Sequence, residues 1–227
     1  MLNFAMVLSG CGKEDGSDVW EVVLLSYFLR KKGITPLFFA PDWGQNEEAD
    51  HPTEIISSDR SSILKESARI TGEEIKTILS LSGRDIDALI LPGGGGVIKN
   101  LSDLVGGPKH DYLKPKPELQ RIIREFYRRK KPIGACGVAA LLVASALREI
   151  LDTQLTLTIG KDPQLIQQAE VLGASNILSR GTEAVIDSEH KVVTTPAGLL
   201  KLKLTDVALS LENLIDGMIE LTSSKPK

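Results

Sequence analysis

The sequence predicts an α/β protein in which a mostly parallel sheet is covered by helices on both faces. Apolar runs of strand length alternate with longer segments of helical period along the chain, and this alternation is typical of a parallel sheet with crossover helices. The 227 residues are 42% hydrophobic and 25% charged, a composition that excludes a disordered or collagen-like chain. We expect a single domain over residues 1–227, because one core of this size needs no disulfide or metal to support it.

The first part of the chain predicts two strands with a helix between them. Residues 2–8 are almost wholly apolar, as in a strand that is buried on both faces. Residues 17–32 have helical period, and Gly33 favours a helix end there. The residues of this helix that we expect to pack include Val19, Val22, Val23, Tyr27 and Leu29. The second strand is expected at 34–40, followed by an insertion that begins with a polar loop at 41–59 and has short helical segments at 62–70 and 73–81.

The rest of the chain continues the alternation. Residues 86–91 form an apolar strand that ends in a glycine run, and residues 132–135 form a short strand before the apolar helical segment 137–151. The segment 118–130 is amphipathic and predicts a surface helix. The remaining predicted elements are a strand at 155–159, a helix at 163–172, a hairpin of 183–187 with 191–195, and a helix at 204–221.

Charge and hydropathy exclude several classes of partner. The net charge is −3, so no overall positive field attracts nucleic acid or anionic lipid. The longest apolar stretches, such as 138–147, are shorter than the roughly 20 residues that cross a bilayer. The chain also starts without the basic region of a signal peptide. We therefore expect a cytoplasmic protein with no nucleic-acid and no membrane partner.

Cys136 lies at the junction between a predicted buried strand and the helical segment that follows it. A strand, a sharp turn and a helix in this order form a nucleophile elbow, and the small residues Gly134, Ala135 and Gly137 would permit such a turn. The positive end of the helix dipole favours the thiolate form, so we expect an ionised thiol that solvent can reach. The alternative is a buried cysteine that only packs.

The glycine run Gly93–Gly96 follows another predicted strand and offers backbone N–H groups that could stabilise an oxyanion. Its position excludes the dinucleotide-binding fingerprint, which follows the first strand, and no Gly-Lys-Ser/Thr follows that would make a phosphate-binding loop. The alternative is a tight turn without a ligand.

A third segment, residues 9–21, leaves the first predicted strand and carries Cys11 and Glu21. Because ligands of open α/β sheets bind at the carboxyl ends of the strands, the three segments together predict one site. Asp18 and Glu21 also fit a capping box, in which Glu21 would serve only the start of the helix. The two cysteines, with no C-x-x-C pair and no clustered histidines, predict neither a disulfide framework nor a metal site.

These motifs and several others resemble the glutamine-amidotransferase-like superfamily of PfpI and the protein deglycases, and its ElbB branch most closely. The matching motifs occur in order along nearly the whole chain. They are Leu8-Ser9-Gly10-Cys11-Gly12 with Asp15-Gly16-Ser17 and Glu21, Ala68-Arg69-Ile70-Thr71, Pro92-Gly93-Gly94 with Lys99-Asn100-Leu101-Ser102, Cys136, Leu157-Thr158-Ile159-Gly160, and Val193-Thr194-Thr195-Pro196-Ala197.

The resemblance implies a flavodoxin-like three-layer sandwich that forms a homodimer and needs no metal or other cofactor. It implies that Cys136 is a nucleophile, that Glu21 hydrogen-bonds its sulfur, and that the N–H groups of Gly94 and Gly137 form the oxyanion hole. The implied activity is that of a glyoxalase-like lyase, related to the protein deglycases, which converts small reactive dicarbonyls such as glyoxal to hydroxy acids. The branch is also linked to isoprenoid biosynthesis.

The sequence departs from the wider superfamily in lacking a histidine after the nucleophile, at the end of the next strand. Residues 156–160 occupy that place, and His51, His110 and His190 all lie elsewhere. We therefore expect neither a Cys–His dyad nor a glutaminase activity. The ElbB branch lacks this histidine as well and tends to carry one in the loop that contains His51, whereas His190 is expected to be exposed in a hairpin turn.

Further candidates for the pocket are Cys11, Gly95, Asn100 and His51. A disulfide between Cys11 and Cys136 is a further hypothesis, which requires Cα atoms within about 7 Å of each other. A second functional hypothesis is a redox-responsive regulatory or binding protein in which Cys136 oxidises, because a low thiol pKa and solvent access favour oxidation as well as catalysis.

Overall fold

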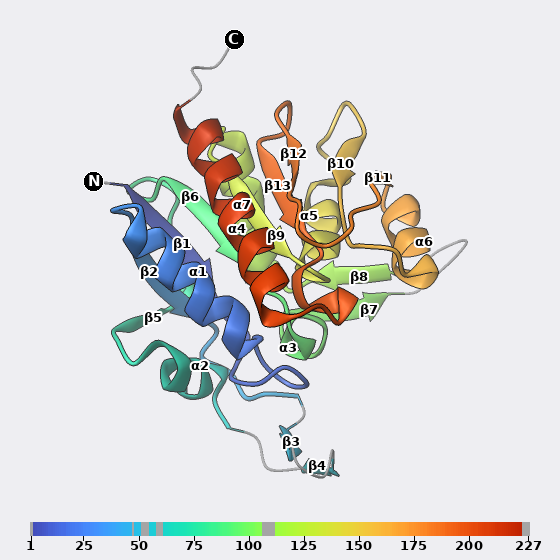
Figure 1. Cartoon of the computed structure of the whole chain (residues 1–227). Helices are drawn as coiled ribbons and strands as arrows, with labels where there is room; N and C mark the ends of the chain where they lie inside the picture. Colours follow the sequence, from blue (N-terminus) through green and yellow to red (C-terminus); the bar gives the residue numbers. More distant parts are fainter. Residues whose placement is uncertain (1, 47, 51–54, 58–60, 106–111, 224–227) are drawn as a thin grey trace.

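The computed structural model describes residues 2–46, 48–50, 55–57, 61–105 and 112–223. Its main sheet has seven strands, which are β1 (Asn3–Val7), β2 (Thr35–Ala40), β5 (Ile75–Thr77), β6 (Ala88–Leu91), β9 (Ile133–Cys136), β12 (Val185–Asp187) and β13 (Val192–Thr195). Their order across the sheet is β12-β13-β9-β6-β1-β2-β5, and all neighbours are parallel except the β12–β13 hairpin. The mostly parallel sheet predicted from the sequence is confirmed (Figure 1).

Helices cover both faces of this sheet, as predicted (Figure 1). The helices are α1 (Val19–Lys31), α2 (Ile63–Thr71) and α7 (Leu204–Ser223) on one face, and α4 (Pro117–Arg128), α5 (Ala139–Leu147) and α6 (Pro163–Val171) on the other. Alternate residues of β1 point to opposite layers: Phe4 and Met6 pack with α1 and α7, while Ala5 and Val7 pack with α4 and α5. None of the helices in the described part of the chain combines the length and apolar character that a bilayer crossing requires.

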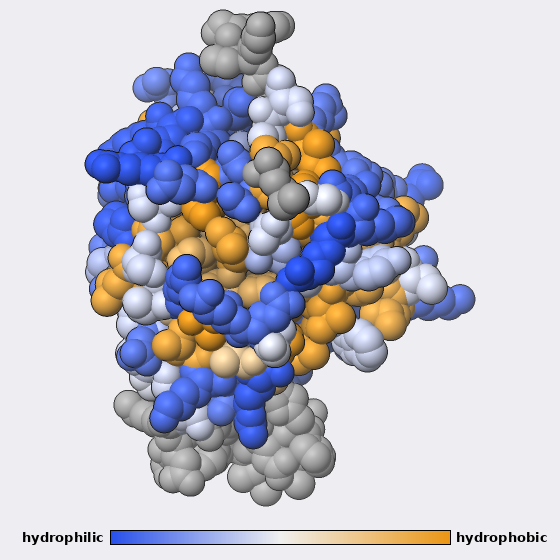
Figure 2. All heavy atoms as spheres, turned by 90° about the vertical axis from the view of Figure 1, so that its left-hand side faces the viewer, coloured by the Kyte–Doolittle hydropathy of each residue, from blue (hydrophilic) through white to orange (hydrophobic). Residues whose placement is uncertain are grey.

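Helix α1 packs along a narrower face than the sequence predicts. Val22 and Leu29 are buried, but Val19, Val23 and Tyr27 are exposed by 37%, 45% and 57%. These three residues recur every four positions, so they form one stripe on the side of the helix that faces away from the sheet. Figure 2 shows the side of the molecule that carries α1 in Figure 1, and apolar atoms are interspersed among hydrophilic ones there.

The segment 73–81, predicted to be helical, instead forms strand β5 and the short 3₁₀ helix η1 (Ile78–Ser80). Ile75 and Thr77 are β-branched and pair with the end of β2 at the edge of the sheet, so strand pairing outweighs the helical pattern. The smaller elements are the hairpins β3 (Glu48–Asp50) with β4 (Ile55–Ser57) and β7 (Ser102–Val105) with β8 (Tyr112–Pro115), the parallel pair β10 (Leu155–Leu157) with β11 (Ala174–Asn176), helix α3 (Gly95–Lys99) and the 3₁₀ helix η2 (Ala197–Leu200).

The prediction that His190 is exposed is wrong, because its side chain is buried at the turn between β12 and β13. Its Nδ1 lies 2.8 Å from Asp187 Oδ2, and its Nε2 lies 3.0 Å from Thr153 Oγ1. The ring also stacks on Tyr127 with centroids 6.3 Å apart. These contacts join the hairpin to the loop before β10, at the end of the sheet opposite the carboxyl ends of the parallel strands.

Candidate functional site

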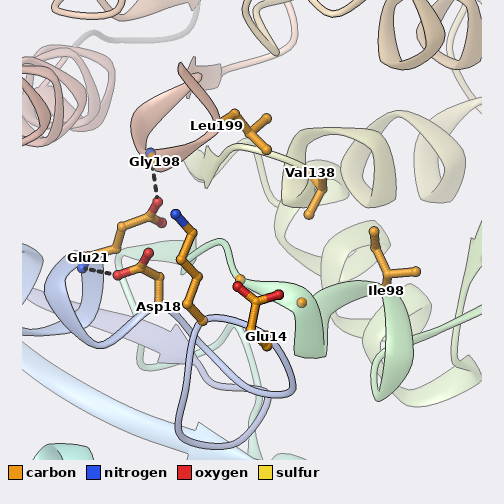
Figure 3. A pocket seen from close by; sticks show the side chains of 10 residues that line it. Glu14, Asp18, Glu21, Ile98, Val138, Gly198 and Leu199 are labelled. Carbon is orange, nitrogen blue, oxygen red and sulfur yellow. Dashed lines mark hydrogen bonds between the residues drawn. The ribbon is translucent and has the colours of Figure 1, made fainter. Parts of the chain in front are cut away.

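A pocket of about 190 Å³ opens at the carboxyl ends of the parallel strands (Figure 3). Its walls come from the loop after β1, the start of α1, the glycine run after β6, the start of α5 and the segment η2 after β13, so the predicted meeting of three segments occurs at this edge. The lining residues are Lys13, Glu14, Asp18, Glu21, Gly94, Gly95, Ile98, Val138, Gly198 and Leu199. Among the described residues, no group of three or more His, Cys, Asp or Glu side chains could hold a metal ion.

Glu21 reaches the pocket from the first turn of α1. Asp18 caps this helix, since its Oδ1 accepts the N–H groups of Trp20 at 2.9 Å and Glu21 at 3.3 Å. The Glu21 carboxyl does not complete a capping box. It instead accepts the N–H of Gly93 at 2.7 Å and that of Gly198 at 3.1 Å, so it joins α1 to the segments that follow β6 and β13.

The environment of Glu21 makes its carboxyl group easier to protonate than that of an ordinary glutamate. Burial raises the pKa of Glu21 to about 7, and the neighbouring Asp18 carboxylate contributes to the rise. The N–H groups of Gly93 and Gly198 and the ammonium of Lys13 lower this pKa, because they stabilise the charged form. A carboxyl group with a pKa near neutrality can both accept and donate a proton at physiological pH.

Cys136 ends β9, is fully buried and is not among the residues that line the pocket. Burial raises the pKa of its thiol well above the usual value, and the carboxyl groups of Glu21 and Asp18, including a hydrogen bond with Glu21, raise it further. The expectation of an ionised thiol in contact with solvent is therefore wrong for this structure. A helix terminus contributes only about 0.3–1 kcal/mol to a nearby charge, which is less than the cost of removing a thiolate from water.

The turn after Cys136 differs from the predicted oxyanion hole. Gly137 has a φ of +55°, which glycine adopts without strain, and it makes the sharp bend between β9 and α5. Its N–H donates to the carbonyl of Thr195 at 2.8 Å, so the prediction that this group is available to an oxyanion is wrong. The side chain of Leu199 covers the bend, because a β-carbon at Gly137 would lie 3.2 Å from Leu199 Cγ.

The backbone conformation of the glycine run depends on contacts with the loop after β1, although Gly94 and Gly95 also line the pocket. Gly94 has a φ of +115°, and a β-carbon there would lie 2.3 Å from the carbonyl oxygen of Gly16. The N–H of Gly95 donates to the carbonyl of Lys13 at 2.6 Å, so it is not available to a ligand. The N–H of Gly94 has no acceptor among the described residues, and Gly94 lines the pocket. The tight-turn alternative therefore explains most of these glycines.

The other candidates lie outside the pocket lining. Asn100 is buried, and its Nδ2 donates to the carbonyls of Ser9 at 2.9 Å and Asp15 at 2.7 Å, so it holds the loop after β1 in place. Cys11 is half-buried with its pKa raised by burial and then by Glu66, and both cysteines are free thiols. His51 and His110 lie outside the described residues.

Sequence reasoning assigned no pocket role to Lys13, Glu14, Asp18, Ile98, Val138, Gly198 or Leu199. The first three belong to the segment after β1, which the sequence does predict to be at the site. Gly198 and Leu199 come directly after β13, and the rule that ligands bind beyond the carboxyl ends of strands would have indicated them as well. The sequence predicted the second strand of the hairpin at 183–195, but the residues just beyond that strand were not assigned to the pocket.

Comparison with known proteins places this architecture in a family. The chain is 33% identical over 96% of its length to the rat protein "ES1 protein homolog, mitochondrial", covering 83% of that protein. It is also 33% identical over 96% of its length to the human "Glutamine amidotransferase-like class 1 domain-containing protein 3, mitochondrial", covering 82% of it. The chain belongs to this ES1 family of glutamine amidotransferase-like proteins. No family model matches the chain.

Solved structures agree with the assignment. A crystal structure described as that of an isoprenoid biosynthesis protein with an amidotransferase-like domain, from Ehrlichia chaffeensis, is 32% identical, with a TM-score of 0.89 and coverage of 97% of this chain and 99% of that one. A ThiJ/PfpI domain protein from Brachyspira murdochii, at 15% identity and a TM-score of 0.59, shares the fold. The resemblance to the ElbB branch of the PfpI superfamily and its flavodoxin-like sandwich is confirmed.

The family assignment corrects one expectation. The rat and human relatives both carry the word mitochondrial in their names, which contradicts the predicted cytoplasmic location. That prediction used the absence of a basic region at the start of the chain, and the chain matches only 83% and 82% of those two relatives. Composition at one end of a sequence is therefore a weak guide to compartment.

Proposed function

We propose that the chain is a cysteine-dependent enzyme that converts small dicarbonyls such as glyoxal to hydroxy acids without a cofactor. The observation that carries the proposal is the position of Glu21, whose carboxyl, with a pKa of about 7, lines the pocket on one side and hydrogen-bonds the Cys136 thiol on the other. One group can then exchange protons with both the sulfur and a bound carbonyl compound.

Because the Cys136 thiol is buried and its pKa is raised, the proposed reaction starts from the protonated thiol and not from a thiolate. The Glu21 carboxylate would take the thiol proton as the sulfur adds to an aldehyde carbon, which forms a hemithioacetal. Glu21 would then move a proton from the sulfur-bearing carbon to the neighbouring carbonyl carbon. The hydroxyl proton of the hemithioacetal would pass to the oxygen of that carbonyl, which leaves a thioester of the hydroxy acid. Water would hydrolyse the thioester to release the hydroxy acid and restore the thiol, so the net reaction is glyoxal plus water giving glycolic acid.

Two backbone groups can serve the oxyanion that forms in these steps. Gly94 and Val138 line the pocket, and their N–H groups have no acceptor among the described residues. Val138 would replace the predicted donor Gly137, whose N–H is bound to Thr195. Cys136 can meet a substrate in the pocket only after a movement of the side chains that cover it, and Leu199 lies over its turn.

A link to isoprenoid biosynthesis is part of the proposal, because the Ehrlichia relative is described as an isoprenoid biosynthesis protein. The pocket volume of about 190 Å³ is below the roughly 300–1,000 Å³ of pockets that hold drug-sized ligands. This small volume favours a small carbonyl compound as the ligand.

The test compares Glu21→Gln and Cys136→Ser with the unaltered protein in glycolate formation from glyoxal, followed by NMR. We expect Glu21→Gln to lower the rate by about 10²–10⁴-fold, because it removes the group that takes the thiol proton and moves the later protons. Cys136→Ser should abolish turnover. Glu170→Gln, on the exposed side of α6, is the matched control and should keep the rate. Glycolate production by Glu21→Gln at the unaltered rate would contradict the mechanism.

The same burial applies to the redox-responsive alternative, which also needs the side chains over Cys136 to move. Oxidation requires an accessible thiolate, and Cys136 is enclosed with a raised pKa. Mass spectrometry after mild peroxide would support the alternative only if Cys136 oxidised stoichiometrically while glyoxal turnover was negligible. A homodimer, which the family resemblance implies, remains part of the proposal, and sedimentation equilibrium would test it.

A further inference from the structure

One carboxylate oxygen in the pocket lacks a hydrogen-bond donor. Oδ1 of Asp18 accepts two N–H groups at the start of α1, but Oδ2 accepts none from the described residues. Asp18 is only 7% exposed, and it lines the pocket. A ligand that enters the pocket with a hydrogen-bond donor can therefore pair with Oδ2 in place of water.

Space for such a ligand lies in front of Asp18 and Glu21 together. A β-carbon built at Gly198 would lie 3.4 Å from Asp18 Oδ2 and 3.3 Å from Glu21 Oε1. Both oxygens therefore face the same point, which the absence of a side chain at Gly198 leaves open. Figure 3 shows the two carboxyl groups side by side below Gly198. A small molecule there can contact the proton-transfer group and Asp18 at once.

The charges around the pocket limit which molecules can enter. The carboxylates of Glu14 and Asp18 line it against the single ammonium of Lys13. Glu21, with a pKa of about 7, adds a third negative charge in part of the molecules near neutral pH. A carboxylate or phosphate group on a substrate would meet net repulsion within a few ångströms, whereas a hydroxyl or a protonated amine would not. The remaining side chains of the wall, Ile98, Val138 and Leu199, are apolar.

We propose that Asp18 determines specificity by accepting, through Oδ2, a hydrogen bond from a hydroxyl or amine N–H of a carbonyl substrate that carries no anionic group. Hydrated aldehydes and carbinolamines, which form when an amine adds to an aldehyde, have such donors. Phosphorylated and carboxylated carbonyl compounds are excluded by repulsion. This inference rests on the proposed function because it takes the ligand to be a substrate. The binding preference itself can be measured without turnover.

The variant Asp18→Asn is the sharpest test, because asparagine is as good a helix cap as aspartate. Its carbonyl oxygen can replace Oδ1, while its NH₂ group replaces Oδ2 and donates instead of accepting. Asp162→Asn is the matched control: Asp162 caps α6 by accepting the N–H groups of Gln164 at 2.9 Å and Leu165 at 3.1 Å, and it is exposed outside the pocket lining. Both variants lose one carboxylate and keep one cap.

The first readout is the ratio of kcat/KM for glyoxal to 1/Ki for glyoxylate, a carboxylated analogue that can compete for the pocket but lacks the second aldehyde that turnover requires. We expect Asp18→Asn to lower this ratio by about tenfold, because the hydrated glyoxal loses an acceptor and the anion loses a repulsive charge. Asp162→Asn should leave the ratio unchanged. An unchanged ratio in Asp18→Asn would overturn the inference.

The second readout needs no enzymatic activity. In a Cys11→Ser, Cys136→Ser background, Ile98→Cys places the only cysteine on the pocket wall. The rates at which this cysteine reacts with a cationic and an anionic methanethiosulfonate report the local charge. We expect Asp18→Asn to lower the cationic-to-anionic rate ratio by about tenfold. This change corresponds to about threefold slower reaction with the cationic reagent and about threefold faster reaction with the anionic one. A lowered ratio without glyoxal turnover in the unaltered protein would refute the proposed function and uphold the role of Asp18. A ratio equal to that of Asp162→Asn would refute the role of Asp18 whatever the turnover.

Discussion

The Glu21 carboxyl accepts the N–H of Gly198 at 3.1 Å, although 177 positions separate the two residues in the chain. Together with the bond from Gly93, this contact places a titratable group of α1 between the thiol of β9 and the pocket. The pH dependence, the reactivity of the thiol and the tolerance of nearby glycines should all follow from this arrangement.

Glu21 should make the protein less stable as the pH rises from about 4.5 to 7. Its pKa in the folded state, about 7, lies above the ordinary value of 4.5, so the folded state binds the proton more tightly than the unfolded state in this window. The contribution is present in full below pH 4.5 and is lost by pH 7, with a total of roughly 3 kcal/mol. Urea unfolding of the unaltered protein and Glu21→Gln across this range should give diverging curves, and parallel curves would contradict the prediction.

Cys136 should react with iodoacetamide more slowly than Cys11 in the native protein. Cys136 is fully buried with a thiol pKa raised well above the ordinary value, whereas Cys11 is half-buried. Peptide mass spectrometry after timed alkylation measures both rates, and the difference should vanish in denaturant. Equal native rates would show that the thiol is open to solvent.

Leu199→Ala should raise the native alkylation rate of Cys136 several-fold without affecting Cys11. The Leu199 side chain lies against Gly137, and its truncation removes the cover over the turn that follows the thiol. Leu178→Ala, an exposed leucine outside the pocket lining, is the control. If both variants alkylate at the unaltered rate, the cover over Cys136 is provided by other groups.

Two glycine substitutions at the pocket should have different effects. Gly94→Ala should destabilise the protein by about 2–4 kcal/mol, because the φ is +115° and the new β-carbon would lie 2.3 Å from a backbone oxygen. Gly198→Ala should stay within about 1 kcal/mol of the unaltered protein but reduce glyoxal turnover, since its β-carbon occupies the space before Glu21 and Asp18. Thermal unfolding and kcat/KM separate the two, and equal stability losses would refute the distinction.

Asp187→Ala should cost about 2–3 kcal/mol of folding free energy while leaving turnover intact. Asp187 accepts the N–H of Thr156 at 2.8 Å, the N–H of His190 at 2.9 Å and, at 2.8 Å, the His190 ring nitrogen, and its loss leaves buried donors unpaired. The measurement is urea unfolding with glyoxal turnover on the same preparation. A turnover loss that exceeds the unfolded fraction would show that this end of the sheet affects the site.

Local patterns in the sequence were sufficient to predict most of the fold. Apolar runs and helical periods depend on neighbours in sequence, and they located the seven-stranded sheet except β5, whose pairing depends on a distant strand. The end of β9 at Cys136, the cap Asp18 and the hairpin before residue 196 were likewise visible in the sequence, because each is set by residues within one turn or one strand.

The state of the site could not be obtained in the same way. A helix dipole near Cys136 can be inferred from sequence, but the burial and the carboxyl groups that raise the pKa of its thiol come from other segments. The bond of Gly137 to Thr195, the cover from Leu199 and the burial of His190 also depend on residues brought together by folding. Residue types at the edge of the sheet indicated where chemistry could occur. Desolvation and hydrogen bonding depend on the packed surroundings, so the tertiary structure determined which protons and hydrogen-bond donors are available there.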